Sequence, residues 1–307
     1  MKKLLIFLLM TTVGSLYAQT VAEVQISPLI KGSLFSPEVN AAQKNVIILI
    51  AGSGPTNRSG NQIYAVNNSL KFLAEGLVAK GNYVFSYDKR TIANIIAGNT
   101  SDADSRFSQF VDDAKDVLRY FNTTKTYDKI IIAGHSEGSL VGIIAAQESA
   151  DAFISLAGLG RTGDKVLVDQ IARQIPAIRA ETVAAFDNLR KGEDVTVTHP
   201  VLKSFLHKNI QQYMLSYIAL DPQAEIRKLT IPVMIINGTK DIQVAVSEAE
   251  LLKAAKPEAQ LHIIANMNHI FKEVTGDEPA NKATYNNAKL PVMPQLIDII
   301  NDFVKAL

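Results

Sequence analysis

The 307-residue chain contains no cysteine, and this absence excludes several kinds of chemistry. Without thiols the protein has no disulfides, no thiolate metal site and no cysteine nucleophile. Its stability must therefore come from a hydrophobic core. Apolar residues make up 47% of the chain, which is enough to build such a core at this length.

The chain also lacks an excess of charge of either sign. Lysine and arginine total 31 and aspartate and glutamate total 30, so the formal net charge is +1. Nucleic-acid binding usually requires a basic surplus, and none is present, nor is there an acidic tail. Proline and glycine are spread along the chain, without a repeat or a low-complexity segment. We expect one globular domain without a nucleic-acid partner, and the sequence predicts no oligomeric state.

A hydrophobic run long enough to cross a membrane is missing as well. The apolar segment 4–10 follows two lysines and fades into small residues, a pattern typical of a secretory signal peptide. We predict cleavage after Ala18, with 1–18 as the signal peptide and 19–307 as an exported domain, periplasmic or secreted. The alternative is an uncleaved membrane anchor, but the run is shorter than the roughly 20 residues of a spanning helix. No cysteine follows it, which excludes a lipid anchor on that residue.

Segments with strand character alternate with segments of helical periodicity. Strands are predicted at 22–30, 32–35, 45–50, 83–87, 130–132, 152–156, 231–236 and 260–265. Helices between and after them are predicted at 70–79, 107–121, 139–149 and 293–306. This alternation predicts an α/β fold, with a mostly parallel central sheet that helices cover on both faces.

The segment 161–229 interrupts this alternation because it carries no strand signal. Its predicted helices cover 165–173, 177–191 and 201–218. It follows the C-terminal end of a strand, where open α/β sheets bind ligands, so we interpret it as a helical cap over the site. The alternative is a set of ordinary helices packed on the sheet. Apolar side chains recur at helical spacing in its last helix, and these are the candidate substrate contacts: Phe205, Leu206, Tyr213, Met214 and Tyr217.

The candidate nucleophile lies in residues 134–138, Gly-His-Ser-Glu-Gly. A predicted strand runs into this motif, and a predicted helix follows it directly. In that setting a G-x-S-x-G motif forms a sharp turn that exposes its serine. The turn leaves no room for bulk beside the serine, and the helix N-terminus favours negative charge there. Ser136 is therefore the candidate nucleophile.

A serine hydroxyl needs a base, and the ordinary pKa of histidine suits this role best. Of the five histidines, His269 follows the last predicted strand, whereas His262 lies within that strand. The acid that would orient this histidine is Asp241, which follows the last strand but one, with Asp164 as the alternative. The order serine, acid, histidine is the one expected for this kind of scaffold.

Two backbone amides are expected to stabilise the oxyanion that forms during acyl transfer. One belongs to Glu137, immediately after the nucleophile. The other belongs to Ser53, in the glycine-rich loop that follows strand 45–50, with Gly52 or Gly54 as alternatives. We expect the side chain of Glu137 to make a supporting hydrogen bond and to take no direct part in the chemistry.

Asp88 and Arg90 are expected to form a structural ion pair near the sheet edge. No cluster of histidine and carboxylate residues has metal-ligand spacing, and no glycine-rich loop of the phosphate-binding type opens a helix. We therefore expect no metal and no cofactor.

Five short elements in this order resemble α/β-hydrolase fold proteins, over essentially the whole chain after residue 18. They lie at 52–55, 87–90, 134–138, 238–241 and 268–269. More narrowly, the chain is similar to exported bacterial serine hydrolases and esterases with a Gly-Ser-Gly-Pro oxyanion loop, related to the serine aminopeptidase-like and lysophospholipase-like group. It departs from them at three positions. Relatives commonly have acidic residues where this chain has Asn57 and Ser59, and glycine where it has Thr91.

The resemblance implies a serine hydrolase that cleaves carboxylic esters of small molecules through a Ser-His-Asp triad and an acyl-enzyme. The apolar cap would favour an acyl or aromatic group. The alternative is a small, aminopeptidase-like serine peptidase that uses the same triad. It would need a cap carboxylate to hold the substrate amine, for which Glu181, Glu193 and Asp194 are available. A non-enzymatic protein on this scaffold should have lost a triad member, and this chain retains all three.

Overall fold

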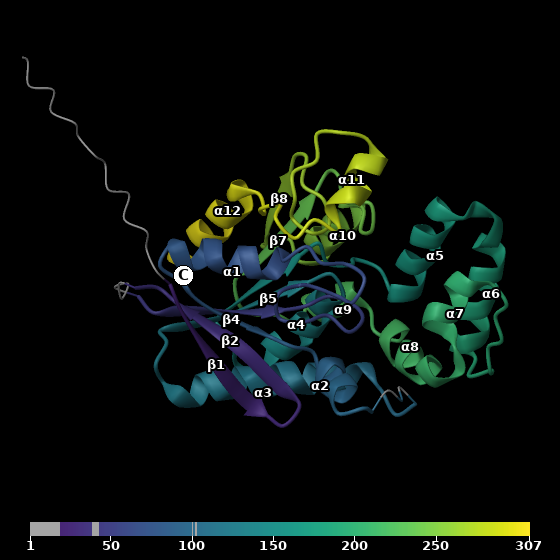
Figure 1. The fold of residues 1–307 in the computed structure, drawn as a ribbon, viewed down its shortest axis with the longest axis horizontal. Helices are drawn as coiled ribbons and strands as arrows, with labels where there is room; N and C mark the ends of the chain where they lie inside the picture. The colour runs from purple at the N-terminus through teal and green to yellow at the C-terminus, as the bar shows by residue number, and fades with distance from the viewer. Residues whose placement is uncertain (1–18, 39–42, 100, 102) are drawn as a thin grey trace, which may run out of the picture.

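A computed structural model describes residues 19–38, 43–99, 101 and 103–307 (Figure 1). The predicted signal peptide, 1–18, lies outside these residues. Within the described ranges, no helix is both long enough and apolar enough to cross a membrane.

The centre of the molecule is a sheet of eight strands. The strands are β1 (Thr20–Ser27), β2 (Ile30–Ser36), β3 (Asn45–Ile50), β4 (Tyr83–Tyr87), β5 (Lys129–His135), β6 (Ala152–Leu156), β7 (Val233–Gly238) and β8 (Gln260–Ile264). Their order across the sheet is β1-β2-β4-β3-β5-β6-β7-β8. Only β1 and β2 run antiparallel to their neighbours, and every pair from β4 to β8 is parallel. The predicted α/β fold with a mostly parallel sheet is therefore confirmed.

Burial explains which strands the sequence predicts well. Every residue of β3 is buried, because β4 and β5 flank it and helices cover both of its faces. Such a strand reads as a continuous apolar run. At the sheet edge, β1 is largely exposed and ends earlier than predicted, because residues 28–29 form the turn into β2.

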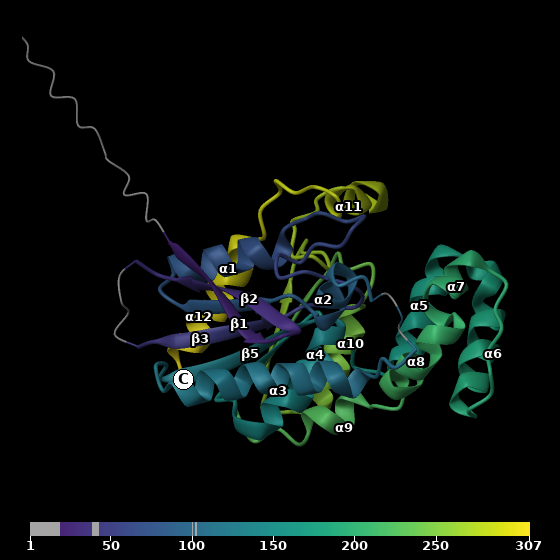
Figure 2. The same cartoon turned by 60° about the horizontal axis from the view of Figure 1, so that its bottom comes forward.

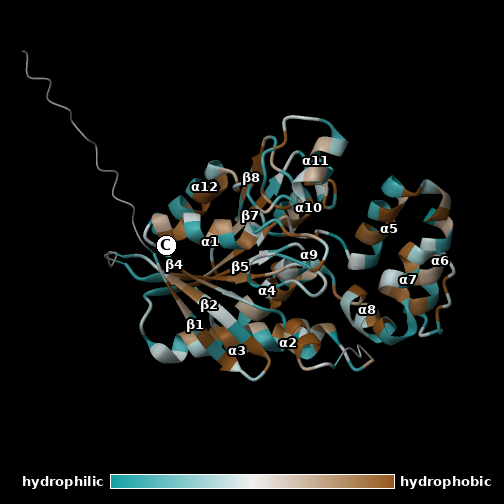
Figure 3. Cartoon of the chain, viewed as in Figure 1, coloured by the Kyte–Doolittle hydropathy of each residue, from teal (hydrophilic) through white to brown (hydrophobic). Residues whose placement is uncertain are grey.

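Helices pack on both faces of the sheet (Figures 1 and 2). On one face lie α1 (Ser69–Ala79) and α12 (Pro294–Lys305), whose apolar residues share a core cluster with β3. The other face is covered by α3 (Phe107–Thr124), α4 (Glu137–Ser149), α9 (Pro222–Ile226) and α10 (Val246–Ala255). Hydrophobic residues accordingly concentrate in the strands and on the inward sides of these helices (Figure 3).

Two short helices lie near the loops at the sheet's carboxyl edge. They are α2 (Arg90–Ile96), which directly follows β4, and α11 (Glu278–Thr284), which follows β8. No periodic apolar stripe marks either segment, so the sequence does not predict these helices.

The inserted segment forms a helical lobe beside the sheet, on the right of Figures 1 and 2. It contains α5 (Gly163–Gln174), α6 (Arg179–Arg190), α7 (Pro200–Leu206) and α8 (Gln211–Ile218), with 3₁₀ turns at Pro176–Ile178 and Lys208–Ile210. The predicted helix 201–218 is broken into α7 and α8. Its break coincides with the Gln211 side chain, which donates to the Leu206 carbonyl (2.9 Å) and thereby satisfies the end of α7.

Candidate active site

Loops at the carboxyl ends of five strands meet at one edge of the sheet. They place Ser53 after β3, Lys89 after β4, Ser136 after β5, Asp241 after β7 and His269 after β8. Parallel strands bring their carboxyl ends to the same edge, so residues far apart in the chain converge there.

The turn between β5 and α4 holds Ser136 in an unusual backbone conformation. Its φ is 55° and its ψ is −123°, a combination that non-glycine residues rarely adopt outside functional sites. Both flanking glycines are required sterically. A Cβ on Gly134 would lie 2.1 Å from the Gly138 carbonyl oxygen, and one on Gly138 would lie 2.5 Å from the Ala51 carbonyl oxygen. Backbone atoms therefore approach positions 134 and 138 too closely for either residue to carry a side chain.

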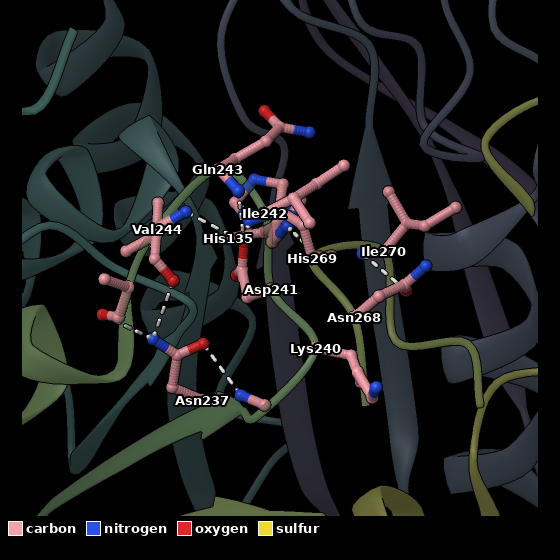
Figure 4. Close-up of polar contacts among 12 residues, drawn as sticks. His135, Asn237, Lys240, Asp241, Ile242, Gln243, Val244, Asn268, His269 and Ile270 are labelled. Atoms are coloured by element: carbon pink, nitrogen blue, oxygen red, sulfur yellow. Dashed lines mark hydrogen bonds and ion pairs between the residues drawn. The ribbon is translucent and has the colours of Figure 1, made fainter. Parts of the chain in front are cut away.

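Asp241 and His269 form a buried hydrogen-bonded pair (Figure 4). His269 Nδ1 and Asp241 Oδ2 are 2.7 Å apart, while Asp241 Oδ1 accepts from the backbone amides of Gln243 and Val244, each at 2.8 Å. A carboxylate can only accept, so Nδ1 carries the proton and Nε2 holds the free lone pair. The loop after β7 thus fixes the carboxylate, and the carboxylate fixes the tautomer of the histidine.

His135, for which the sequence suggested no role, forms a hydrogen bond to the backbone of His269. Its Nε2 donates to the backbone carbonyl of His269 (2.8 Å), and the two rings lie 4.7 Å apart between centroids. Burial, with a smaller contribution from the charge of His269, lowers the pKa of His135 to about 3. His135 is therefore a neutral donor that holds the backbone of the candidate base.

Asn268 fixes the same loop from the other side. Its Oδ1 accepts from the amide of Lys272 (2.9 Å), and its Nδ2 donates to Asn281 Oδ1 (2.9 Å) and Thr284 Oγ1 (2.7 Å). The loop that carries His269 is thereby tied to α11.

Ser136 and His269 line a common pocket of about 160 Å³. Its lining also includes polar residues that were not predicted, from the loop after β3, the loop after β7 and the segment after α11, among them Gln62, Asn67, Gln243 and Tyr285. Burial raises the pKa of the Tyr285 phenol, which therefore stays protonated. No sequence signal marks these residues, because loop packing alone brings them together.

Neither of the predicted oxyanion donors is engaged elsewhere. Among the described residues, the backbone amides of Ser53 and Glu137 have no hydrogen-bond acceptor. The Glu137 carboxylate accepts from Lys89 Nζ at 2.9 Å and is buried, in agreement with the expected supporting hydrogen bond.

The expected ion pair between Asp88 and Arg90 is wrong. Asp88 pairs with Arg58 (2.6 Å), and Arg90 pairs with Asp113 on α3 (2.6 Å). The chain turns from β4 into α2 at this point, so side chains two residues apart face different elements.

Asp164, the alternative candidate for the orienting acid, is paired with another residue. Its carboxylate forms an ion pair with Arg190 inside the lobe (2.6 Å).

The five candidate substrate contacts lie at different depths in the described lobe. Leu206, Met214 and Tyr217 are buried in the hydrophobic core, and Tyr217 stacks on Phe107 of α3 with 5.1 Å between centroids. Phe205 packs on Phe186. None of these four lines the two pockets at the sheet edge.

Tyr213 lines a second pocket, of about 270 Å³, to which the loop after β3 also contributes. Its walls are mostly apolar and come from the loop, α2, α3 and the lobe: Gly54, Pro55, Lys89, Thr91, Asn94, Ile95, Asn99, Ser105, Phe110, Ile210 and Tyr213. Thr91 is part of this wall, and its Oγ1 is buried without a hydrogen-bond partner among the described residues.

Within the described part of the chain, no group of three or more histidine and carboxylate side chains is arranged to hold a metal ion.

The family model of the serine aminopeptidases, S33, matches residues 67–274, which includes the turn of Ser136, Asp241 and His269. The chain belongs to this family. Esterase EstD of Thermotoga maritima is a sequence relative, 24% identical over 253 residues that cover 78% of this chain. This chain spans only 57% of the length of EstD.

Solved structures show the same α/β-hydrolase fold. Est1E from Butyrivibrio proteoclasticus superposes with a TM-score of 0.60 at 16% identity, over 94% of this chain and 99% of that one. The Pyrococcus furiosus esterase PF2001 superposes with a TM-score of 0.55 at 13% identity, over 94% of this chain and 91% of that one. At these identities the likeness concerns the fold alone.

Proposed function

We propose that this protein is a serine hydrolase that cleaves carboxylic esters, with Ser136 as nucleophile, His269 as base and Asp241 as orienting acid. The observation that carries the proposal is the Asp241–His269 pair (2.7 Å), which borders the same pocket as a serine held in a strained turn. Family membership and the relative EstD support it.

The reaction follows from the roles of these groups. His269 Nε2 takes the proton of Ser136 as its Oγ attacks the ester carbonyl, and the amides of Ser53 and Glu137 stabilise the oxyanion. The tetrahedral intermediate collapses as His269 gives the proton to the leaving alcohol, which leaves an acyl-enzyme. His269 then takes a proton from water as the water oxygen attacks the acyl carbon. The bond to Ser136 Oγ breaks, His269 returns the proton to that oxygen, and the acid is released.

The second pocket suggests which acyl or aromatic group the ester substrate carries. It adjoins the proposed oxyanion loop through Gly54 and Pro55, and apolar side chains such as Ile95, Phe110 and Ile210 form much of its wall. Its volume of about 270 Å³ lies near the lower end of the range for small-ligand sites. We infer that it takes an uncharged acyl or aromatic group of modest size.

The same two pockets argue against the peptidase alternative, in spite of the family's name. An aminopeptidase needs a carboxylate to hold the substrate amine, but neither pocket has an aspartate or glutamate among its described lining residues. Of the three available carboxylates, Glu193 and Asp194 are exposed in the lobe, and Glu181 lies within hydrogen-bond reach of Thr198 (3.4 Å).

The deciding experiment compares aryl esters of graded acyl length with amino-acid arylamides, using the wild type and Ser136→Ala. We expect ester turnover that disappears in the variant, together with labelling of Ser136 by a fluorophosphonate probe. Turnover of arylamides without turnover of esters would reverse the assignment in favour of the peptidase. Absence of labelling at Ser136 would contradict both.

We also propose that the protein is exported after cleavage behind Ala18, which the pattern of 1–18 supports. Expression of the full chain in a bacterium, followed by fractionation and N-terminal sequencing, tests this. We expect a periplasmic or secreted product that begins at Gln19, and a cytoplasmic product with an intact N-terminus would contradict the proposal.

A further inference from the structure

Lys89 is a buried cation that is hydrogen-bonded to residues on both sides of the proposed oxyanion hole. Only 5% of its surface is exposed, and lysine is almost never this buried unless its charge is paired. Its Nζ donates to Glu137 Oε1 at 2.9 Å and to the Gly52 carbonyl oxygen at 3.0 Å, and it lies 4.6 Å from the ring centroid of Phe110. Each hydrogen-bond partner belongs to a different half of the hole.

The bond to Gly52 constrains the first oxyanion donor. The Gly52 carbonyl and the Ser53 N–H belong to one planar, trans peptide unit, so they point in opposite directions. When Lys89 holds the carbonyl, the N–H of Ser53 must face the other side, and Ser53 lines the pocket of Ser136. Glycine at position 52 leaves this peptide free to rotate in the absence of such a bond.

The bond to Glu137 constrains the second donor. Glu137 is the first residue of α4, and its own amide is the other candidate donor. Its carboxylate is buried, and Tyr213 from the lobe lies beside it: burial and the Glu137 carboxylate raise the pKa of this tyrosine well above its ordinary value. The carboxylate therefore faces a cation from the β4 loop and a neutral phenol from α8.

We propose that Lys89 is a positioning residue that assembles the oxyanion hole by joining the loop after β3 to the start of α4. The inference rests on the proposed function of Ser136. A single ammonium group holds both donor-bearing residues, and its charge polarises the Gly52–Ser53 peptide so that the Ser53 N–H is a stronger donor. Preorganised donors of this kind are a major source of transition-state stabilisation.

The first test removes the ammonium group without leaving an unpaired buried charge. Lys89→Met keeps the length of the side chain, and the double variant with Glu137→Gln keeps the site neutral. We expect kcat for an aryl butyrate to fall about 100-fold in the double variant, the effect typical of one lost oxyanion donor, while KM changes less than threefold. A double variant with wild-type kcat would overturn the inference.

A neighbouring ion pair supplies the matched control. Arg90 and Asp113 form an ion pair one residue further along the chain, with two contacts of 2.6 Å, and among the described residues neither has a hydrogen bond or ion pair with Gly52, Ser53 or Glu137. The variant Arg90→Met with Asp113→Asn removes a comparable pair. We expect its kcat to stay within about threefold of the wild type; an equal fall in both double variants would assign the effect of Lys89 to general loss of structure.

Because the chain has no cysteine, a single thiol introduced at position 89 can be alkylated selectively. This allows the ammonium group to be restored chemically. In Lys89→Cys, alkylation of the unfolded chain with 2-bromoethylamine gives a lysine analogue, and 1-bromopropane gives a neutral side chain of similar length. After refolding beside wild type treated in the same way, we expect the aminoethyl form to regain kcat to within tenfold of the wild type and the propyl form to remain impaired. Equal activity of the two forms would show that bulk matters and the ammonium group does not.

A transition-state analogue separates this inference from the proposed function. An aryl trifluoromethyl ketone forms a hemiketal oxyanion with a serine nucleophile, whereas the matching methyl ketone is a ground-state ligand. In the Lys89→Met, Glu137→Gln variant we expect trifluoromethyl ketone affinity to fall by the same factor as kcat, with unchanged methyl ketone affinity. If wild type lacks Ser136-dependent ester turnover, the proposed function fails; if it turns over esters and the variant binds both ketones normally, only the role of Lys89 fails.

Discussion

At the scale of single residues, hydrogen-bond partners determine which ring nitrogen of each histidine in the site carries the proton. The Asp241 carboxylate accepts hydrogen bonds from two backbone amides and from His269. Because a carboxylate cannot donate, the proton of the histidine stays on Nδ1. His135 donates to a carbonyl that can only accept, so its proton stays on Nε2. Both histidines are thus held in one tautomer before any substrate arrives.

Asp241→Asn tests the first of these constraints. The asparagine carbonyl can still accept from the amides of Gln243 and Val244, but its NH₂ group would then face Nδ1 and favour the wrong tautomer. We expect kcat for an aryl ester to fall by about 10⁴ with little loss of stability. Asp164→Asn, which changes an acid paired with Arg190, should leave kcat within about threefold of the wild type. Similar kinetics for the two variants would contradict the role of Asp241.

His135→Gln tests the buried neutral histidine through the pH dependence of stability. The pKa of His135 is about 3 in the folded state against an ordinary 6.5, so the unfolded chain binds the proton first as the pH falls. The stabilising contribution is complete above pH 6.5 and is lost progressively toward pH 3. Between about pH 6 and 4, the free energy of unfolding of the wild type should fall about 1.4 kcal/mol per pH unit more steeply than that of the variant.

Urea denaturation across this pH range measures the difference. His207→Gln, a change at an exposed histidine, serves as the control and should follow the wild-type curve. Parallel curves for the wild type and His135→Gln would mean that His135 is not buried in its neutral form.

At the scale of elements, burial decides what could be predicted. The strands β3, β4 and β6 have the bounds predicted for them, because strands buried on both faces read as apolar runs. Helix α10 was missed: three of its buried positions are Glu248, Ala249 and Ala255, which produce no apolar stripe. The long predicted helix of the lobe is divided because the side chain of Gln211 satisfies the end of α7, an event that no periodicity reveals.

The same distinction applies to the site. The positions of Ser136, Asp241 and His269 at strand ends followed from the order of strands and loops along the chain. The contacts of His135 and Lys89 did not, because they depend on how loops from distant strands pack against each other. Sequence patterns therefore located the groups proposed to react, and the structure was needed to find the groups that hold them.

Helix α2 offers a prediction about acyl-chain preference. Thr91 lies in its first turn and forms part of the wall of the second pocket, with a hydroxyl that has no partner among the described residues. Thr91→Gly should lengthen the pocket, and each methylene that becomes buried should raise kcat/KM about fourfold, equivalent to about 0.8 kcal/mol. A series of aryl acetate, butyrate and hexanoate esters measures the shift.

Thr91→Val keeps the shape of the side chain and removes only the hydroxyl. We expect it to retain the wild-type chain-length profile, which would attribute the effect of Thr91→Gly to space. If the profile of Thr91→Gly matched that of the wild type, the second pocket would not hold the acyl group.

At the scale of the whole molecule, the lobe is joined to the sheet domain by packing on α3 and by a polar clamp at its start. Tyr217 stacks on Phe107, and Ser216 Oγ accepts from the Phe107 amide at 2.8 Å. At the point where the chain leaves β6 for the lobe, the buried carboxylate of Glu248 accepts from the amides of Gly160 (3.0 Å) and Arg161 (2.9 Å). The lobe in turn supplies part of the wall of the second pocket.

Glu248→Ala should therefore affect stability and substrate choice together. It leaves two backbone amides without their acceptor and removes one of the two carboxylates that pair with the Arg161 guanidinium, the other being Asp169, at a cost of about 3 kcal/mol in the free energy of unfolding. Because Ile210 and Tyr213 of the lobe line the second pocket, a loosened clamp should raise KM for bulky aryl esters more than for acetates.

Glu250→Ala is the matched control. It removes an exposed carboxylate from the same helix and should change the free energy of unfolding by no more than about 0.5 kcal/mol. A loss of stability with an equal change in KM for both ester classes would mean that the lobe stabilises the fold without shaping the pocket.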